Sequence, residues 1–186
     1  MYVASQVDKA FFEKHGYINI KDTGPEFMEI VTRSYEFITK NHSTYFSKPM
    51  KLAYWSKDNT PKQVIDVLRG GCSELRQIVV SSIIKNICVK LMGNQRFFIT
   101  HAKLSIKFPN TETEWFAHQD NAYKTVNGGE PKKGITLGVF LEDSSLENGT
   151  IEVFPGSHLL GVLPHQIDHD QLKLDDNAVK NIKFNK

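Results

Sequence analysis

Residues 147–158 of this chain read ENGTIEVFPGSH, and residues 115–120 before them read WFAHQD. In the first stretch, the asparagine–glycine pair favours a tight turn, because glycine accepts a positive φ. The apolar alternation that follows predicts a strand, and the proline–glycine pair ends it. This order of turn, strand and turn predicts a β-rich C-terminal half.

The shorter stretch holds a histidine and a carboxylate two residues apart. Side chains on an extended backbone alternate between its two faces, so His118 and Asp120 project from the same face and can bind one metal ion. An imidazole and a carboxylate, completed by a second imidazole, form the ligand set of non-haem iron(II) oxygenases, which leaves open positions on the metal. A lone His-x-Asp pair is more often part of a solvated loop. The metal interpretation therefore depends on the two stretches together.

The two stretches together resemble the motifs of the phytanoyl-CoA dioxygenase family. That family has Trp-x-x-His-Gln-Asp, a hydrophobic strand, Asn-Gly-x-apolar and Pro-Gly-Ser-His, which here occupy residues 115–120, 137–141, 148–151 and 155–158. Residues 11–20 are similar to the N-terminal helix and first strand of the family. The resemblance implies an enzyme that uses iron(II) and 2-oxoglutarate, built on a cupin-like jelly roll.

The resemblance also implies the residues of the site. His118 and Asp120 would be two of the three protein ligands of the metal. The polar face of the strand expected at residues 97–108 would turn toward the same barrel mouth. Candidate contacts to 2-oxoglutarate, or walls of its pocket, are Ser105, Lys107, Trp115 and Thr136. Tyr123 and His101 are candidates for the substrate side. For each contact taken singly, the alternative is an ordinary half-exposed strand face.

The chain departs from the family after Asp120. The family has a third histidine ligand, followed about ten residues later by an arginine that binds the far carboxylate of 2-oxoglutarate. Here only His158, His165 and His169 follow, and no arginine. His158 belongs to the Pro-Gly-Ser-His turn, which precedes the third ligand in the family. The i, i+4 spacing of His165 and His169 suits a metal site on a helix or, more simply, a solvated loop. We therefore expect the third ligand, the arginine and the last strands to lie beyond Lys186.

Hydrophobic periodicity predicts helices before residue 94 and strands after it. The expected helices span residues 25–40, 60–70 and 75–91. The expected strands span residues 97–108, 135–141, 150–154, 160–163 and a last one that begins near residue 179. This order predicts an α+β fold, in which N-terminal helices pack on an antiparallel double-stranded β-helix, or jelly roll, whose final strands are missing. We expect one domain over residues 1–186, mainly helical to residue 94 and jelly roll from 95.

Composition favours a soluble globular protein and excludes several classes. A formal net charge of +2, with dispersed lysine and arginine, gives no sign of a nucleic-acid partner. The two cysteines, Cys72 and Cys88, have no disulfide or zinc spacing and are expected to be reduced. The sequence shows neither a signal peptide nor a membrane span, so a cytoplasmic enzyme without a membrane partner is expected.

The leading hypothesis is an iron(II)- and 2-oxoglutarate-dependent dioxygenase that hydroxylates a small molecule with dioxygen. Related halogenases have alanine or glycine in place of Asp120, so the carboxylate favours hydroxylation. The second hypothesis is an inactive jelly-roll binding protein, supported by the missing ligand and arginine. The third is a cupin-type metal enzyme that uses His118, Asp120 and His158 without a keto acid. The sequence specifies neither the substrate nor the oligomeric state.

Overall fold

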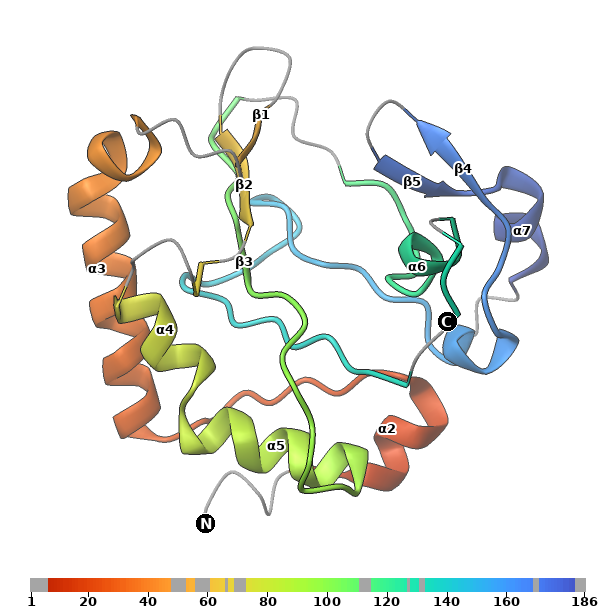
Figure 1. Cartoon of the computed structure of the whole chain (residues 1–186), viewed down its shortest axis with the longest axis horizontal. Helices are drawn as coiled ribbons and strands as arrows, with labels where there is room; N and C mark the ends of the chain where they lie inside the picture. The colour runs from red at the N-terminus through yellow and green to blue at the C-terminus, as the bar shows by residue number, and fades with distance from the viewer. Residues whose placement is uncertain are drawn as a thin grey trace. The chain divides into compact units, whose positions relative to one another are not determined.

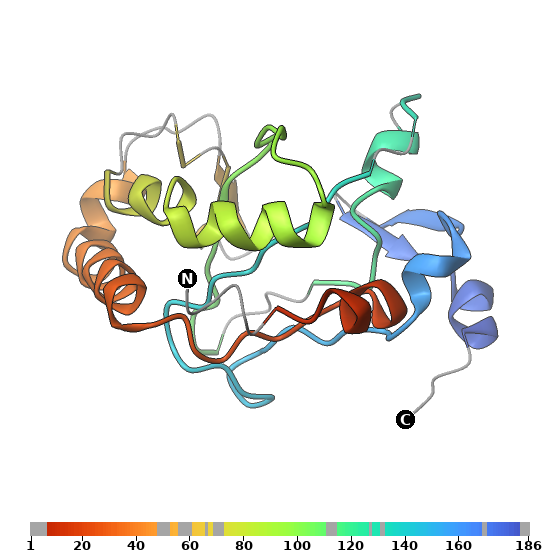
Figure 2. The same cartoon turned by 90° about the horizontal axis from the view of Figure 1, so that it is seen from below.

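The computed structural model describes residues 7–47, 53–55, 61–65, 67–68, 73–110, 115–126, 128–130, 133–168 and 171–182. Its contacts divide the chain into two units that alternate along the sequence. The first unit comprises Met1–Val7, Ile20–Thr113 and Leu137–Ile151, and the second comprises Asp8–Asn19, Glu114–Thr136 and Glu152–Lys186. Each unit combines helices with short strands, so the chain is a mixed α and β protein (Figures 1 and 2). The single domain with a boundary at residue 94 stays a prediction.

Helix α3, Pro25–Ser47, is the longest helix of the first unit. Its predicted apolar stripe is confirmed, because Phe27, Val31 and Ser34 are buried. The Ser34 hydroxyl donates to the carbonyl oxygen of Ile30 at 2.8 Å, which satisfies a polar group on the buried face. The helix begins at the expected proline but continues past residue 40, into the stretch where a connection is expected.

Helices α4, Ser73–Val79, and α5, Ser82–Met92, replace the single helix that the periodicity predicts. The break occurs because Ser81 has an extended backbone and its side chain accepts a hydrogen bond from the backbone N–H of Ile84, as an N-cap does. The end of α5 lies where the sequence predicts it, at Gly93, whose φ of 66° closes the helix. A serine within an apolar repeat is the sequence signal that could have predicted this break, because serine is a common N-cap residue.

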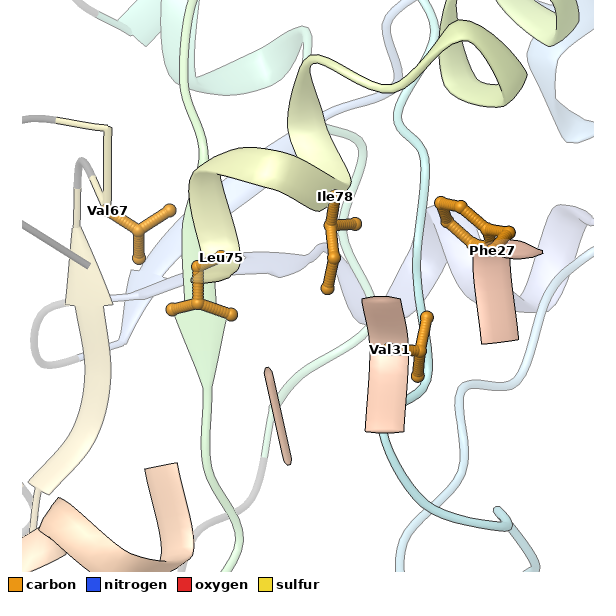
Figure 3. Packing of buried hydrophobic residues seen from close by; sticks show 5 residues of the cluster. All are labelled: Phe27, Val31, Val67, Leu75 and Ile78. Carbon is orange, nitrogen blue, oxygen red and sulfur yellow. The ribbon is translucent and has the colours of Figure 1, made fainter. Parts of the chain in front are cut away.

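The hydrophobic core of the first unit lies where α3 and α4 meet (Figure 3). Its buried members are Phe27 and Val31 of α3, Leu75 and Ile78 of α4, and Val67. Partly buried side chains pack against this cluster: Ile30, Phe37, Ile38, Ile83, Ile84, Ala102, Leu104, Ile106, Val139 and Leu141. The alternation predicted over residues 97–108 is confirmed only from residue 102 on, where even-numbered positions are covered and odd-numbered positions are exposed.

The strands of the first unit form an antiparallel sheet of β1, Ala53–Trp55, β2, Pro61–Ile65, and β3, Lys103–Ser105, in that order. The helix predicted over residues 60–70 is therefore wrong at its start. Residues 60–63, threonine, proline, lysine and glutamine, have the pattern of a helix-capping box. Pairing on both sides of β2 gives its backbone a ladder, which outweighs that local pattern. Proline is tolerated at the first position of a strand, and Gln63 is buried with its amide donating to the Ser105 hydroxyl at 3.0 Å.

Several predicted strands are absent from the described residues. Among them, no strand occurs at 135–141 or 150–154, nor after helix α2, Lys9–His15, in the N-terminal motif. Residues 157–160 form the 3-10 helix η1, Ser157–Leu160. A strand exists only where a neighbour completes its backbone ladder, whereas alternation reports burial alone. Val139 and Leu141 illustrate the difference, since they pack on the core without belonging to a sheet. β3 is shorter than predicted for the same reason, and Phe98, which the alternation expected over residues 97–108 places on the apolar face, is 78% exposed.

The second unit contains α2, Lys9–His15, α6, Ala122–Val126, and the antiparallel hairpin of β4, His165–Asp168, and β5, Gln171–Leu174, followed by α7, Asp176–Asn181. Leu174 of β5 is buried against Ala178 and Ile182. The strand predicted to begin near residue 179 is wrong for residues 179–181, which belong to α7. The Asp175 carboxylate accepts from the backbone N–H groups of Asn177 and Ala178 and thereby starts a helix there.

The capping role of Asp175 has a measurable consequence. The hydrogen bond from the Gln166 amide, followed by those from the α7 backbone, lowers the pKa of Asp175 below 3.8. A carboxyl whose pKa is lowered by folding stabilises the fold above its unfolded pKa, and that contribution is lost as the pH falls through the folded value. We expect the Asp175 side-chain carbon to titrate below pH 3.8 in an NMR titration. In the matched variant Gln166→Leu it should titrate closer to the ordinary value.

Cys88 lies on the buried face of α5 as a free thiol. Burial raises its pKa, because an apolar environment disfavours the thiolate. The thiol is therefore suited to packing rather than to nucleophilic chemistry. Cys72 lies outside the described residues.

Candidate metal centre

His118 and Asp120 lie in the second unit, in a segment that runs through a turn into α6. Their side chains converge: the imidazole Nε2 of His118 is 3.5 Å from the carboxylate Oδ1 of Asp120. Two ligand atoms that each lie about 2.1 Å from one ion are roughly 3 Å apart when their bonds to it are at right angles. A small closing movement therefore brings this pair to the separation that a shared metal requires.

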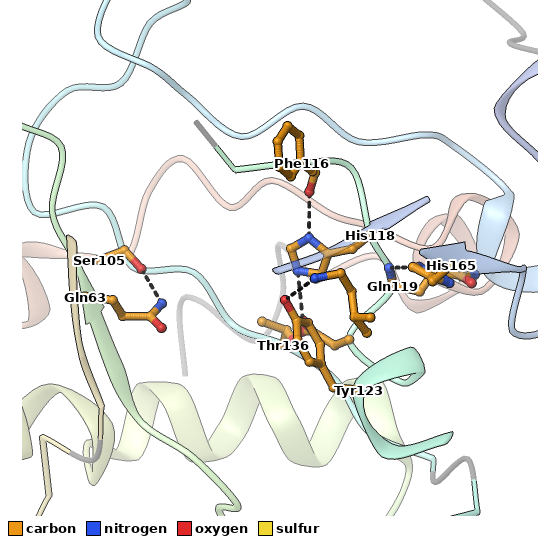
Figure 4. Close-up of polar contacts among 10 residues, drawn as sticks. Gln63, Ser105, Phe116, His118, Gln119, Tyr123, Thr136 and His165 are labelled. Carbon is orange, nitrogen blue, oxygen red and sulfur yellow. Dashed lines mark hydrogen bonds and ion pairs between the residues drawn. The ribbon is translucent and has the colours of Figure 1, made fainter. Parts of the chain in front are cut away.

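The orientation of His118 suits a metal ligand. Its Nδ1 donates to the carbonyl oxygen of Phe116 at 2.7 Å, because a carbonyl can only accept (Figure 4). This bond directs Nε2 toward Asp120. The Tyr123 ring meets the imidazole edge-on, with centroids 5.5 Å apart. Metal-binding histidines commonly donate their second ring N–H to a carbonyl in this way, which fixes the tautomer and the angle of the ring.

The Asp120 carboxylate is held from its other side. Its Oδ2 accepts a hydrogen bond of 2.5 Å from the hydroxyl of Thr136. Because one oxygen is occupied by Thr136, the oxygen that faces His118 is the one suited to a metal. The donor types, their separation and the two outer hydrogen bonds fit a divalent cation.

The remaining residues predicted for the site divide between the two units. Trp115 is half-buried in the second unit, whereas Ser105 and Lys107 belong to the first unit. The Ser105 hydroxyl accepts from Gln63, and the Lys107 ammonium donates to the carbonyl oxygen of Gly149. The structure thus brings Thr136 to the His118–Asp120 pair, and it gives Ser105 and Lys107 partners within the first unit.

His158 has a structural contact, not a place beside the other two candidate ligands. Its Nε2 donates to the carbonyl oxygen of Glu13 at 2.9 Å, and the N–H of Gly156 donates to the carbonyl oxygen of His15 at 2.8 Å. The Pro-Gly-Ser-His turn thereby satisfies carbonyls that the end of α2 leaves without helical partners. His118, Asp120 and His158 form no metal-binding group in the structure, so the hypothesis of a cupin-type site with these three ligands is wrong.

Contact between α2 and this turn depends on Gly16. Its φ is +79°, and a Cβ atom built there would lie 2.3 Å from Nδ1 of His158. Gly16→Ala should therefore combine backbone strain, about 1–3 kcal/mol, with displacement of the His158 ring. We expect a lower urea midpoint and faster amide exchange at Gly156. Gly24→Ala is the matched control, since Gly24 also has a positive φ of 80° but no atom within 4 Å of the added Cβ. Equal losses in the two variants would show that the His158 contact contributes nothing.

The structure also contains a contact that the sequence did not suggest. Nε2 of His165, on β4, accepts a 3.0 Å hydrogen bond from the backbone N–H of Gln119, the residue between the two candidate ligands. From the sequence alone, His165 is expected in a solvated loop or in a helical pair with His169. The available signal was the alternation of Leu172 and Leu174 with polar residues, which predicts a strand able to pair with residues 165–168.

No third ligand joins the pair in the part of the chain that the structure describes. There, no group of three histidine, cysteine, aspartate or glutamate side chains is arranged to hold a metal ion. His169, the partner of His165 in the i, i+4 spacing, lies outside the described residues. The site thus consists, so far as it is described, of His118 and Asp120 with their outer hydrogen bonds.

Fold and site together define a mixed α and β protein with a His-x-Asp pair suited to a divalent metal. The chain belongs to the phytanoyl-CoA dioxygenase family, since the model of the family "Phytanoyl-CoA dioxygenase (PhyH)" matches residues 12–180. No curated protein and no solved structure gave a significant match. Membership is consistent with an oxygenase-like function, for which iron(II), 2-oxoglutarate, dioxygen and a small-molecule substrate are the family's expected partners. No helix in the described ranges is both long and apolar enough to cross a membrane.

Proposed function

We propose that this protein is an iron(II)- and 2-oxoglutarate-dependent dioxygenase that hydroxylates a small molecule. The observation that carries the proposal is the convergence of His118 Nε2 and Asp120 Oδ1, 3.5 Å apart, in a chain that matches the family over residues 12–180. The bound iron would supply the oxygen chemistry, coupling cleavage of 2-oxoglutarate to succinate and carbon dioxide with oxidation of the substrate. The fold that we propose around it is the cupin-like jelly roll of the family.

Residues of the second unit would hold the metal and fix its ligands. His118 contributes Nε2, and the Phe116 carbonyl keeps the ring in the tautomer that has its lone pair there. Asp120 contributes Oδ1 and a negative charge, while Thr136 occupies Oδ2. The carboxylate also fills the position that a halogenase leaves open, which favours hydroxylation over halogenation.

We further propose that Trp115, which lies in the same unit as the candidate ligands, forms a wall of the keto-acid pocket. That Ser105 and Lys107 contact the keto acid stays a prediction from the sequence. Lys107 is exposed and at present donates to a neutral carbonyl oxygen, that of Gly149. A carboxylate is a stronger partner for an ammonium group than a neutral carbonyl is. The Lys107 ammonium is therefore chemically suited to a carboxylate such as those of 2-oxoglutarate.

A paramagnetic titration tests the proposed metal site even where binding is weak. Substoichiometric Mn(II), added to ¹⁵N-labelled protein, should broaden the ring signals of His118 and the amide signals of residues 118–120 before others. Adding 2-oxoglutarate should tighten Mn(II) binding, because two ligands that share a metal reinforce each other's affinity. Anaerobic Fe(II) titration and release of succinate in air then test the reaction itself.

The result that overturns the proposal is equally definite. If Mn(II) at millimolar concentration leaves residues 118–120 unbroadened and 2-oxoglutarate changes nothing, the chain carries no such centre. The binding protein without oxygenase activity is then the better description of this chain.

A further inference from the structure

The peptide between the two candidate ligands is fixed on several sides by one segment. Gln119 lies in the middle of His118-Gln119-Asp120, and its backbone N–H donates to Nε2 of His165. Its side-chain amide donates to the carbonyl oxygen of Gly161 at 2.9 Å, and its side-chain oxygen accepts from the N–H of Leu163 at 2.8 Å. These three bonds attach the ligand segment to residues 161–165, which lead into β4.

A fourth bond attaches the same segment to β5. The N–H of Leu174 donates to the carbonyl oxygen of Ala117, the residue before His118, at 2.8 Å. Leu174 is buried in the core of the second unit, against α7. The ligand segment therefore rests on the β4–β5 hairpin, which is itself anchored by packing.

The hydrogen bonds of His165 determine its protonation. The Gln119 N–H can only donate, so Nε2 must carry a lone pair, and the Leu163 carbonyl can only accept, so Nδ1, 2.7 Å away, must carry the proton. His165 is thus a neutral imidazole with its proton on Nδ1. Both nitrogens have partners within the fold, so His165 is not available as a metal ligand in this conformation.

We propose that His165 is a positioning residue for the metal centre: it holds the Gln119 peptide so that His118 and Asp120 on either side converge. This inference rests on the proposed function, because that function supplies the metal. The hydrogen bonds of His165 are observed in the structure whether or not a metal binds. A peptide that loses its acceptor can rotate, and rotation about Gln119 changes the angle between the side chains of its two neighbours. Removing a direct hydrogen-bond partner of a metal ligand lowers metal affinity by about 10- to 100-fold. His165 contacts the peptide between the two ligands and not a ligand itself, so we expect an effect near the lower end of this range.

Two substitutions separate positioning from packing. His165→Phe keeps a ring of similar size and removes both hydrogen bonds. His165→Gln places an amide oxygen where Nε2 was and restores the acceptor for Gln119. The control in the same strand is Ile167→Thr, at a side chain that is 68% exposed. Each variant is prepared as the full 186-residue chain and titrated with Mn(II), with melting temperature recorded alongside.

A readout independent of metal accompanies the titration. In the native protein, the ¹⁵N shifts of the His165 ring should show the Nδ1–H tautomer, and the Gln119 amide should be protected from exchange. In His165→Phe, Gln119 protection should be lost and the His118 ring signals should move, while His165→Gln and Ile167→Thr should resemble the native protein.

The outcomes distinguish this inference from the proposed function. A drop in Mn(II) affinity of about 10-fold or more in His165→Phe, rescued in His165→Gln, supports positioning. Unchanged affinity in His165→Phe overturns it, as does a ring that shows the other tautomer. If the native protein binds no Mn(II), the proposed function fails. In that case, the positioning role of His165 is supported if the His118 ring signals move in His165→Phe. It is overturned if those signals stay where they are in the native protein.

Discussion

His118→Ala is expected to abolish detectable metal binding by this chain. The substitution removes one of the two ligands described for the site, and it also removes the group that meets Asp120 at 3.5 Å. Loss of an outer hydrogen-bond partner of a ligand lowers affinity about 10- to 100-fold. Loss of the ligand itself should exceed that range. In the Mn(II) titration, the amide signals of residues 118–120 should stay sharp in this variant.

The control is another histidine of the second unit, changed in the same way. His15→Ala removes an imidazole that stacks on Phe11 at the end of α2, with centroids 4.3 Å apart. The carbonyl of residue 15, which binds the Gly156 N–H, is retained. Mn(II) binding should survive in His15→Ala. If His118→Ala binds Mn(II) as tightly as His15→Ala does, then His118 is not a ligand.

Asp120 allows a second, graded measurement at the same site. Asp120→Asn keeps the shape of the side chain but removes the charge and one of the two oxygens, so the remaining amide oxygen can either accept from Thr136 or bind the metal. A neutral amide oxygen is a weaker ligand for a divalent cation than a carboxylate. We expect affinity between that of the native protein and that of His118→Ala. Thr136→Val, which removes the donor to Oδ2, should have a smaller effect than either.

Periodicity could predict the helices because a helix satisfies its backbone internally. The stripe of α3 lies where the spacing places it, and Gly93 ends α5 as expected. Periodicity did not predict the helix boundaries that single capping side chains set. The hydroxyl of Ser81 divides one apolar repeat into two helices, and the carboxylate of Asp175 starts a helix where a strand was predicted. Caps are single side chains, so a pattern of many residues does not reveal them.

Strands were harder to predict because their hydrogen bonds depend on neighbours distant in sequence. Pro61 follows a threonine in a local capping pattern, yet the segment pairs with β1 and β3. The same reason limits prediction of the site. The spacing of His118 and Asp120 predicts that both side chains project from one face, because the two residues are close in sequence. The hydrogen bond between Gln119 and His165 exists only because the β4–β5 hairpin carries His165 to that peptide.

Phe27→Ala should produce the largest loss of stability in the first unit. The ring is 3% exposed and packs in the cluster of α3 and α4 (Figure 3). Truncation of a buried phenylalanine costs about 3–5 kcal/mol, because apolar contact is lost and a cavity remains. Alanine favours a helix more than phenylalanine does, but only by roughly 0.5 kcal/mol, which does not offset the loss. For a chain of this length, the melting temperature should fall by about 2–4 °C for each kcal/mol.

Met28→Ala is the matched control, since it shortens the adjacent side chain on the other face of the same helix. Met28 is 50% exposed, and surface substitutions usually change stability by less than about 0.5 kcal/mol. Urea unfolding followed by circular dichroism should therefore show a large shift of the midpoint for Phe27→Ala and almost none for Met28→Ala. Equal shifts would mean that α3 does not pack through the stripe that contains Phe27. The core of the first unit, on which β3 and the position of Ser105 and Lys107 depend, would then have to be assigned to a different face of this helix.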